Sequence, residues 1–160
     1  MLIKRKILVA FLALFALLGS AAGASARSLS SSEASLLQTM NTVRTSRGLA
    51  PLRLDVRLLR AARGHSADMM NRQYFAHGAV AARALAQRAR GPVYGEDLAW
   101  GTGVLATPQA TVAAWIASPA HNRVLLERAY REVGVGVAPG VPVAVPGGAT
   151  YTLDAGETGA

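Results

Sequence analysis

The sequence predicts an α+β protein in which helices pack on a small antiparallel sheet of about three strands. Two observations lead to this prediction. Between residues 32 and 126 apolar residues recur at helical spacing, and after residue 130 valines alternate with other residues at the period of a strand. Helices that come first in the chain and strands that come last are typical of an α+β arrangement.

The N-terminus has the pattern of a secretory signal peptide. Basic residues 4–6 precede 12 consecutive apolar residues, 7–18, and small residues ending at Ala26 follow. As a helix, 12 residues span about 18 Å, which is short of the roughly 30 Å hydrocarbon core of a bilayer. We therefore expect a signal peptide at 1–26, a short linker at 27–33 and one domain at 34–157. The expected location is secreted or periplasmic, with membrane contact only during export.

Composition excludes some chemistry and leaves the role of charge open. The chain has no cysteine, which excludes thiol catalysis, cysteine-ligated zinc and disulfides. Removal of residues 1–26 leaves 14 basic residues, all arginine, against 9 acidic ones. This excess is compatible with an anionic envelope surface as partner or with a solvated basic face. The arginines are scattered, so we expect no nucleic-acid partner.

Helix start and stop signals divide the first part of the chain. A capping box at Ser30 and Glu33 opens a helix over about 32–47, and Gly48 is a plausible stop. The remaining helices are predicted from Asp55 to about residue 72, over 81–89, from the Thr107-Pro108 cap to residue 117, and from the Ser118-Pro119 cap to about residue 126.

Three extended runs follow, at 130–137, 141–145 and 150–153. Gly134 and Gly136 predict a strand whose glycine side lies close to a neighbouring element. The aromatic residues Trp100 and Trp115 are expected to be packing anchors.

Histidines and one glutamate are the candidate site residues. His65 lies on an apolar helix stripe and is interpreted as a satisfied core histidine. His77 follows two aromatic residues, Tyr74 and Phe75, expected in the core or at a cleft floor. Glu96 lies in a glycine-bounded segment, and His121 falls near the third position of the last helix, where the positive helix end favours a neutral imidazole. The spacing alone does not join these residues in one site.

Ordered motifs nevertheless resemble one family. The chain contains Asn41-x-x-Arg44, His65-Ser66-x-Asp68, Tyr74-Phe75-x-His77, the run 94–101 (YGEDLAWG), Trp115-x-x-Ser118-Pro119-x-His121 and Val133-Gly134-Val135-Gly136. In this order, over about residues 34–154, they resemble the bacterial form of the CAP superfamily, the SCP-like extracellular domains.

The resemblance implies an α-β-α sandwich with a surface cleft lined by two histidines and up to two acidic residues, able to hold a divalent metal such as zinc. Carried over by position, the metal-site residues are His77, His121 and Glu96. The second acid is absent, because Ser118 stands where it is often found. Two imidazoles and one carboxylate can place three ligands on zinc, whereas the missing carboxylate weakens the case for a general base.

Three functions remain open from the sequence. The first is a non-catalytic secreted binding module, expected to be a monomer, for an unknown lipid, envelope or protein ligand. The second is a metal-dependent hydrolase of peptide or envelope polymer, with His77, Glu96 and His121 as the candidates for catalysis. The third assigns the cleft residues a mainly structural role, with Glu96 bound to main-chain amides in its loop.

Overall fold

The computed structural model describes residues 28–91 and 94–157. The predicted signal peptide at 1–26 lies outside the described residues, as does the first residue of the predicted linker. The described residues from Ser31 onward form one compact unit. In the described part of the chain no helix has the length and apolar character needed to cross a membrane.

The helices lie close to their predicted positions. They are α2 (Ser31–Ser46), α3 (Val56–Arg72), α4 (Val80–Ala86), α5 (Pro108–Ala117) and α6 (Pro119–Leu125), with a 3-10 turn η1 (Gly103–Ala106). Asp55 caps α3, since its carboxylate accepts from the main-chain N–H groups of Arg57 and Leu58. The Thr107 hydroxyl caps α5 in the same way, whereas Ser118 makes no side-chain cap to α6.

The sheet corrects two details of the prediction. Within the described residues it has four strands in the order β1-β3-β4-β2: β1 (Arg53–Leu54), β2 (Tyr94–Gly101), β3 (Glu132–Pro139) and β4 (Ala149–Gly156). It is mixed, because β1 runs parallel to β3 while the other pairs are antiparallel. The strand predicted at 141–145 is wrong. That segment is the turn region between β3 and β4, where Pro142 has no N–H to donate to a ladder.

Strand β2 was not predicted as a strand because Glu96 and Asp97 interrupt the apolar alternation that marks one. It pairs with β4 over its whole length and forms an edge of the sheet. The same strand holds Trp100, which is 42% exposed and so is not the packing anchor expected. Trp115 is one: it is 1% exposed, and its Nε1–H donates to the Leu98 carbonyl over 3.0 Å.

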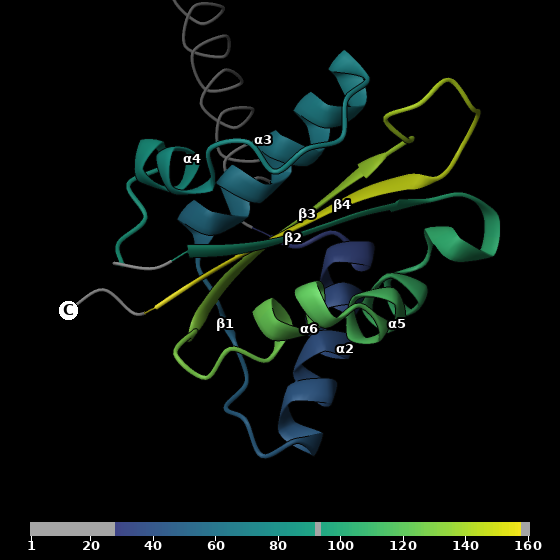
Figure 1. Cartoon of the computed structure of the whole chain (residues 1–160). Coiled ribbons are helices and arrows are strands. Elements are labelled where there is room, and N and C mark those ends of the chain that lie inside the picture. The colour runs from purple at the N-terminus through teal and green to yellow at the C-terminus, as the bar shows by residue number, and fades with distance from the viewer. Residues whose placement is uncertain (1–27, 92–93, 158–160) are drawn as a thin grey trace, which may run out of the picture. The chain divides into compact units, whose positions relative to one another are not determined.

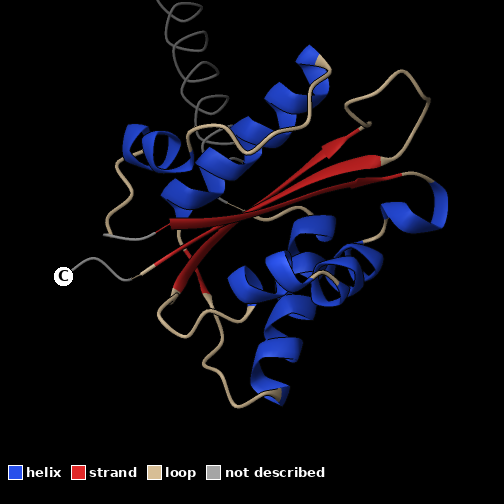
Figure 2. Cartoon of the chain, viewed as in Figure 1, coloured by secondary structure: helices blue, strands red, loops and turns tan. Residues whose placement is uncertain are grey.

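The elements form three layers. Figures 1 and 2 show α3 and α4 on one face of the sheet and α2, α5 and α6 on the other. The α+β class and the α-β-α sandwich are therefore confirmed. Because β2 is an edge strand, side chains on it can contact loops of both helical layers. A site can therefore form along this edge of the sheet.

Gly134 and Gly136 set the distance between the sheet and α3. A Cβ atom on Gly134 would overlap the carbonyl group of Leu58, and one on Gly136 would overlap the carbonyl group of Ala62. Real Cβ atoms do not approach main-chain atoms this closely, so α3 can pack here only against glycine. The predicted role of these two glycines is confirmed.

Arg44 is fully buried and acts as a structural residue. Its guanidinium donates to four main-chain carbonyl groups, those of Ala50, Leu125, Glu127 and Tyr130. Asn41, one turn earlier, exchanges two hydrogen bonds with the main chain of Leu52. The Asn41-x-x-Arg44 motif therefore holds α2 to the loops around it.

Candidate functional site

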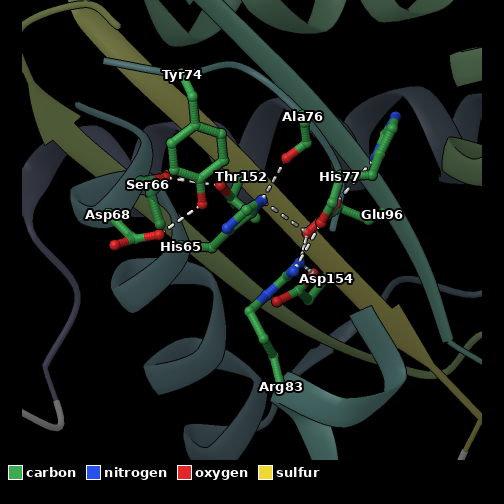
Figure 3. A network of polar contacts seen from close by, with 11 residues as sticks. His65, Ser66, Asp68, Tyr74, Ala76, His77, Arg83, Glu96, Thr152 and Asp154 are labelled. Carbon is green, nitrogen blue, oxygen red and sulfur yellow. Dashed lines mark hydrogen bonds and ion pairs between the residues drawn. The ribbon is translucent and has the colours of Figure 1, made fainter. Parts of the chain in front are cut away.

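The candidate site is built where the loop between α3 and α4 meets strand β2. Helix α3 ends at Arg72, and the next residue, Gln73, has a left-handed conformation (φ 52°) that turns the chain. The loop then returns over the sheet to α4. His77 lies on this loop with a side chain that is 56% exposed. Figure 3 shows His77, Glu96 and Arg83 converging from the loop, β2 and α4, respectively. Residues from three separate elements therefore share one network.

Glu96 is the centre of this network, and its side chain is only 1% exposed. Its Oε1 lies 2.9 Å from His77 Nδ1, and its Oε2 is bound by the Arg83 guanidinium. His65 Nε2 lies 3.7 Å from the same Oε2. With Glu96 as acceptor, His77 carries its proton on Nδ1 and presents the lone pair of Nε2 outward, the tautomer that a carboxylate fixes in many metal-binding histidines.

A second carboxyl group, that of Asp154, is buried beside Glu96. The two residues are direct partners in the β2–β4 register, and Asp154 Oδ1 lies 3.9 Å from Arg83. Burial raises the pKa of Glu96, which Arg83 partly opposes, and burial together with Glu96 raises the pKa of Asp154. One guanidinium thus faces two carboxyl groups, and we expect the pair to retain a proton near neutral pH.

His65 is the satisfied core histidine that was predicted. It is 3% exposed, and its Nε2 lies 3.0 Å from the Ala76 carbonyl oxygen. Burial and then the charge of Arg83 lower its pKa, so this imidazole is neutral at physiological pH. It also packs beside Glu96, and it therefore belongs to the wall behind the site rather than to the exposed surface.

His121 lies at the third residue of α6, as predicted, and is partly buried. Its Nδ1 is buried and finds no hydrogen-bond partner among the described residues. Burial, and after it the charge that His77 can carry, lower the pKa of His121. The imidazole is therefore neutral at physiological pH, with a buried nitrogen whose hydrogen bonding the described residues leave unmet.

The three predicted site residues do not form a three-donor metal cluster in this geometry. His77 and Glu96 are in direct contact, and His121 lies close enough for a charge on His77 to lower the His121 pKa, but the Glu96 oxygens are committed to His77 Nδ1 and Arg83. Nowhere in residues 28–91 and 94–157 do three or more His, Asp or Glu side chains lie in an arrangement that could hold a metal ion. In this geometry Glu96 is the hydrogen-bond partner that orients the His77 imidazole.

Sequence reasoning missed Arg83 and Asp154. Arg83 sits in a short alanine-rich helix with no motif around it, and only its contacts reveal its role. Asp154 could have been found from the pairing of the two strands, because it lies opposite Glu96. Phe75, expected in the core or at a cleft floor, is 46% exposed, whereas Tyr74 is partly buried and its hydroxyl donates to Asp68 over 2.6 Å.

Comparison with known proteins identifies the family. The model of the CAP family, described as the cysteine-rich secretory protein family, matches residues 37–142. The uncharacterized protein YkwD of Bacillus subtilis (strain 168) is 32% identical over 114 residues, which are 68% of this chain and 43% of that protein. The chain thus spans less than half the length of this relative.

Solved structures share the fold. An extracellular protein with an SCP domain from Bacillus anthracis superposes with a TM-score of 0.69 at 23% identity, over 79% of this chain and 40% of that one. An outer surface protein of Borrelia burgdorferi superposes with a TM-score of 0.67 at 17% identity, over 77% and 90% of the two chains. Together with the family match, these findings show that the chain belongs to the CAP superfamily in its bacterial form.

Proposed function

We propose that this protein is an exported, non-catalytic binding module whose ligand is a lipid, an envelope component or another protein, and that the ligand contacts the site at His77 and His121. Its solved relatives support the location, since one is described as an extracellular protein and another as an outer surface protein. The apolar segment at 7–18, with basic residues before it, supports export.

The observation that carries the proposal is the difference in exposure between His77 and Glu96. The His77 side chain is 56% exposed, whereas that of Glu96 is 1% exposed and bound to Arg83. A general base must come within hydrogen-bond reach of the proton it removes. In this geometry Glu96 cannot do so, but it can hold His77 in one tautomer and orientation. An oriented imidazole on an exposed loop is suited to contact a ligand.

Zinc binding is part of the proposal, with two protein ligands instead of the three expected from the sequence. Because Glu96 is committed to other partners, the residues that would hold a divalent metal are the imidazoles of His77 and His121. Burial lowers the pKa of His121, which favours the neutral form that binds a metal. A metal there would leave positions for oxygen atoms of the bound ligand. Glu96 then supports the metal ligand His77 and is not itself a ligand.

Hydrolysis of peptide or envelope polymer is the alternative, and one observation favours it. Burial raises the pKa of Glu96 to about 7, and a carboxyl group with a pKa near neutrality is typical of acid–base catalysts. The closed position of Glu96 argues against this alternative, unless the loop that carries His77 moves away.

Two variants separate binding from hydrolysis. Turnover of casein and of purified peptidoglycan should be measured with wild type, His77→Ala and Glu96→Gln. The binding proposal expects no turnover above a heat-inactivated control in any of the three. It also expects His77→Ala to sediment less with isolated bacterial envelopes than wild type does, while Arg123→Ala, an exposed change on α6, sediments as wild type. Turnover that both site variants abolish would replace the binding proposal with the hydrolase.

A further inference from the structure

A recess lies between α3 and α4. It has a volume of about 240 Å³ and is lined by Arg57, Arg60, Ala86, Gln87 and Arg88. We call it the arginine trough. Three of its five lining residues are arginines, contributed by the first turns of α3 and by a residue that follows the end of α4. No acidic side chain lines it, so three guanidinium groups surround one small volume of solvent.

Two of the three arginines of the trough, Arg60 and Arg88, lack the acidic partners that neutralise other arginines in the chain. Arg57 is 3.5 Å from Asp55, but among residues 28–91 and 94–157 no acidic side chain lies within ion-pair distance of Arg60 or Arg88. Within the same residues Arg60 donates only to the Val56 carbonyl in its own helix. This holds for every acid of the chain, because residues 1–27, 92–93 and 158–160 contain no Asp or Glu. The trough therefore has an unbalanced positive charge.

Arg88 occupies a main-chain conformation that arginine rarely adopts. Its φ is 61°, in the left-handed region, where it closes α4 with a hydrogen bond from its N–H to the Leu85 carbonyl. Glycine is the usual residue at such a position, since a side chain there is strained. Here the position holds an arginine that completes the trough. A strained residue that adds a third like charge gains nothing for the unliganded protein.

The trough continues into a larger cavity of about 380 Å³, with which it shares Arg60, Ala86 and Gln87. This inner cavity is bounded in part by small residues, and a Cβ added to Gly64 on its α3 wall would meet no atom within 4 Å. Arg83 also lines the cavity, and its Nε is buried without a hydrogen-bond partner among the described residues. A molecule held by the trough therefore has room to extend toward Arg83.

We propose that the arginine trough binds a phosphate group and that the body of the phosphate-bearing molecule extends into the cavity beside Gly64. Guanidinium groups bind phosphate through paired, charge-assisted hydrogen bonds. A phosphate offers several acceptor oxygens and up to two negative charges to the three arginines, whereas a carboxylate offers two oxygens and one charge. The trough is lined by neither His77 nor His121, although the cavity beside it reaches Arg83 of the network around Glu96, and the proposal does not depend on the function proposed for the two histidines.

Titration calorimetry with pyrophosphate tests the proposal, using protein produced from the full-length sequence. Saturable binding that weakens as salt rises is expected for wild type. Arg60→Ala and Arg88→Gly should each weaken it at least about tenfold, a typical loss for a charge-assisted hydrogen bond. Arg123→Ala removes the same charge from an exposed position on α6 and should bind as wild type. Equal losses in all three variants, or no binding by wild type, would overturn the proposal.

The Arg88→Gly variant also tests whether weaker pyrophosphate binding results from unfolding. Since glycine adopts the left-handed conformation without strain, this variant should melt at the same temperature as wild type or higher. Weaker pyrophosphate binding together with an unchanged or raised melting temperature supports a binding role for Arg88. If the variant binds pyrophosphate as tightly as wild type, the trough is not the site.

Two further arms identify the source of the phosphate. Vesicles of phosphatidylglycerol and of phosphatidylcholine test a lipid headgroup, and glycerol phosphate tests a small soluble phosphate ester. Gly64→Leu should fill the inner cavity and weaken binding of glycerol phosphate more than binding of pyrophosphate. Binding to phosphatidylglycerol vesicles that Arg88→Gly reduces assigns the site to lipid, and binding to glycerol phosphate alone assigns it to a soluble ester. If the wild-type protein, which retains Arg60 and Arg88, binds neither phosphatidylglycerol vesicles nor glycerol phosphate, the proposal is contradicted.

Discussion

Replacing Asp97 with asparagine is expected to stabilise the protein by an amount that grows with pH. Asp97 is 1% exposed, and neither carboxyl oxygen has a hydrogen-bond partner among the described residues. Burial, with a smaller contribution from the neighbouring Glu96, raises its pKa from 3.8 to about 8. The folded protein therefore keeps this carboxyl group protonated at pH values where the unfolded chain ionises it.

The magnitude follows from linkage between protonation and folding. Each tenfold change in a protonation equilibrium is worth about 1.4 kcal/mol. Below pH 3.8 both states are protonated, and the raised pKa has no effect on stability. As pH rises toward 8 the unfolded chain gains stability by losing the proton, so the folded state is disfavoured by about 4 kcal/mol at pH 7. Asparagine is nearly isosteric and does not ionise, so the variant escapes this loss.

Thermal unfolding of wild type and Asp97→Asn between pH 4 and 8 measures the effect. The two melting temperatures should be similar at pH 4 and should differ by about 10 °C at pH 7, with the variant higher. Asp68→Asn is the matched control: the Tyr74 hydroxyl lowers the pKa of this exposed carboxyl group, so its loss should give no gain that grows with pH. A difference for Asp97→Asn that is the same at every pH would refute the reasoning.

Two further predictions concern the scaffold. Gly134→Ala should unfold the protein or lower its stability by about 3 kcal/mol or more, because the new Cβ would overlap the Leu58 carbonyl group. Gly64→Ala, where the added Cβ faces the cavity and would meet no atom within 4 Å, should instead raise stability by about 0.5–1 kcal/mol; chemical denaturation distinguishes the two, and equal effects would contradict the packing account. Arg44→Leu leaves four carbonyl groups without their donor and should cost at least about 3 kcal/mol by the same assay. A loss below about 1 kcal/mol would show that water replaces the guanidinium.

The helices were predictable because their signals are local. Asp55 and Thr107 cap helices in the structure as their sequence context indicates, and the stop at Gly48 has the positive φ that favours glycine. Glycines 134 and 136 were equally readable, since their spacing placed both on one face of a strand that α3 covers. In each case the residue type and its immediate neighbours determine the structure.

Strand β2 and the arrangement of the candidate site depend on contacts between segments that are distant in the sequence. The spacing of residues in the sequence does not reveal such contacts. Strand β2 carries two buried acidic residues, so its sequence does not look like a strand. Glu96 is bound by Arg83 and lies opposite Asp154, whereas Asp97 has no hydrogen-bond partner among the described residues. For the same reason Glu96 looked like a free ligand, although Arg83 and His77 engage it. Family resemblance singled out His77, Glu96 and His121, and the structure is needed to tell which of them faces outward.

Zinc titration by calorimetry is the most direct test of the claim that His77 and His121 form one binding site with Glu96 behind it. Wild type should bind zinc saturably, and His77→Ala and His121→Ala should each abolish that binding. Glu96→Gln should weaken binding by roughly 10- to 100-fold without abolishing it, as expected for a residue that orients a ligand. If neither histidine variant changes the zinc isotherm, or if wild type binds no zinc, the paired-histidine site is contradicted.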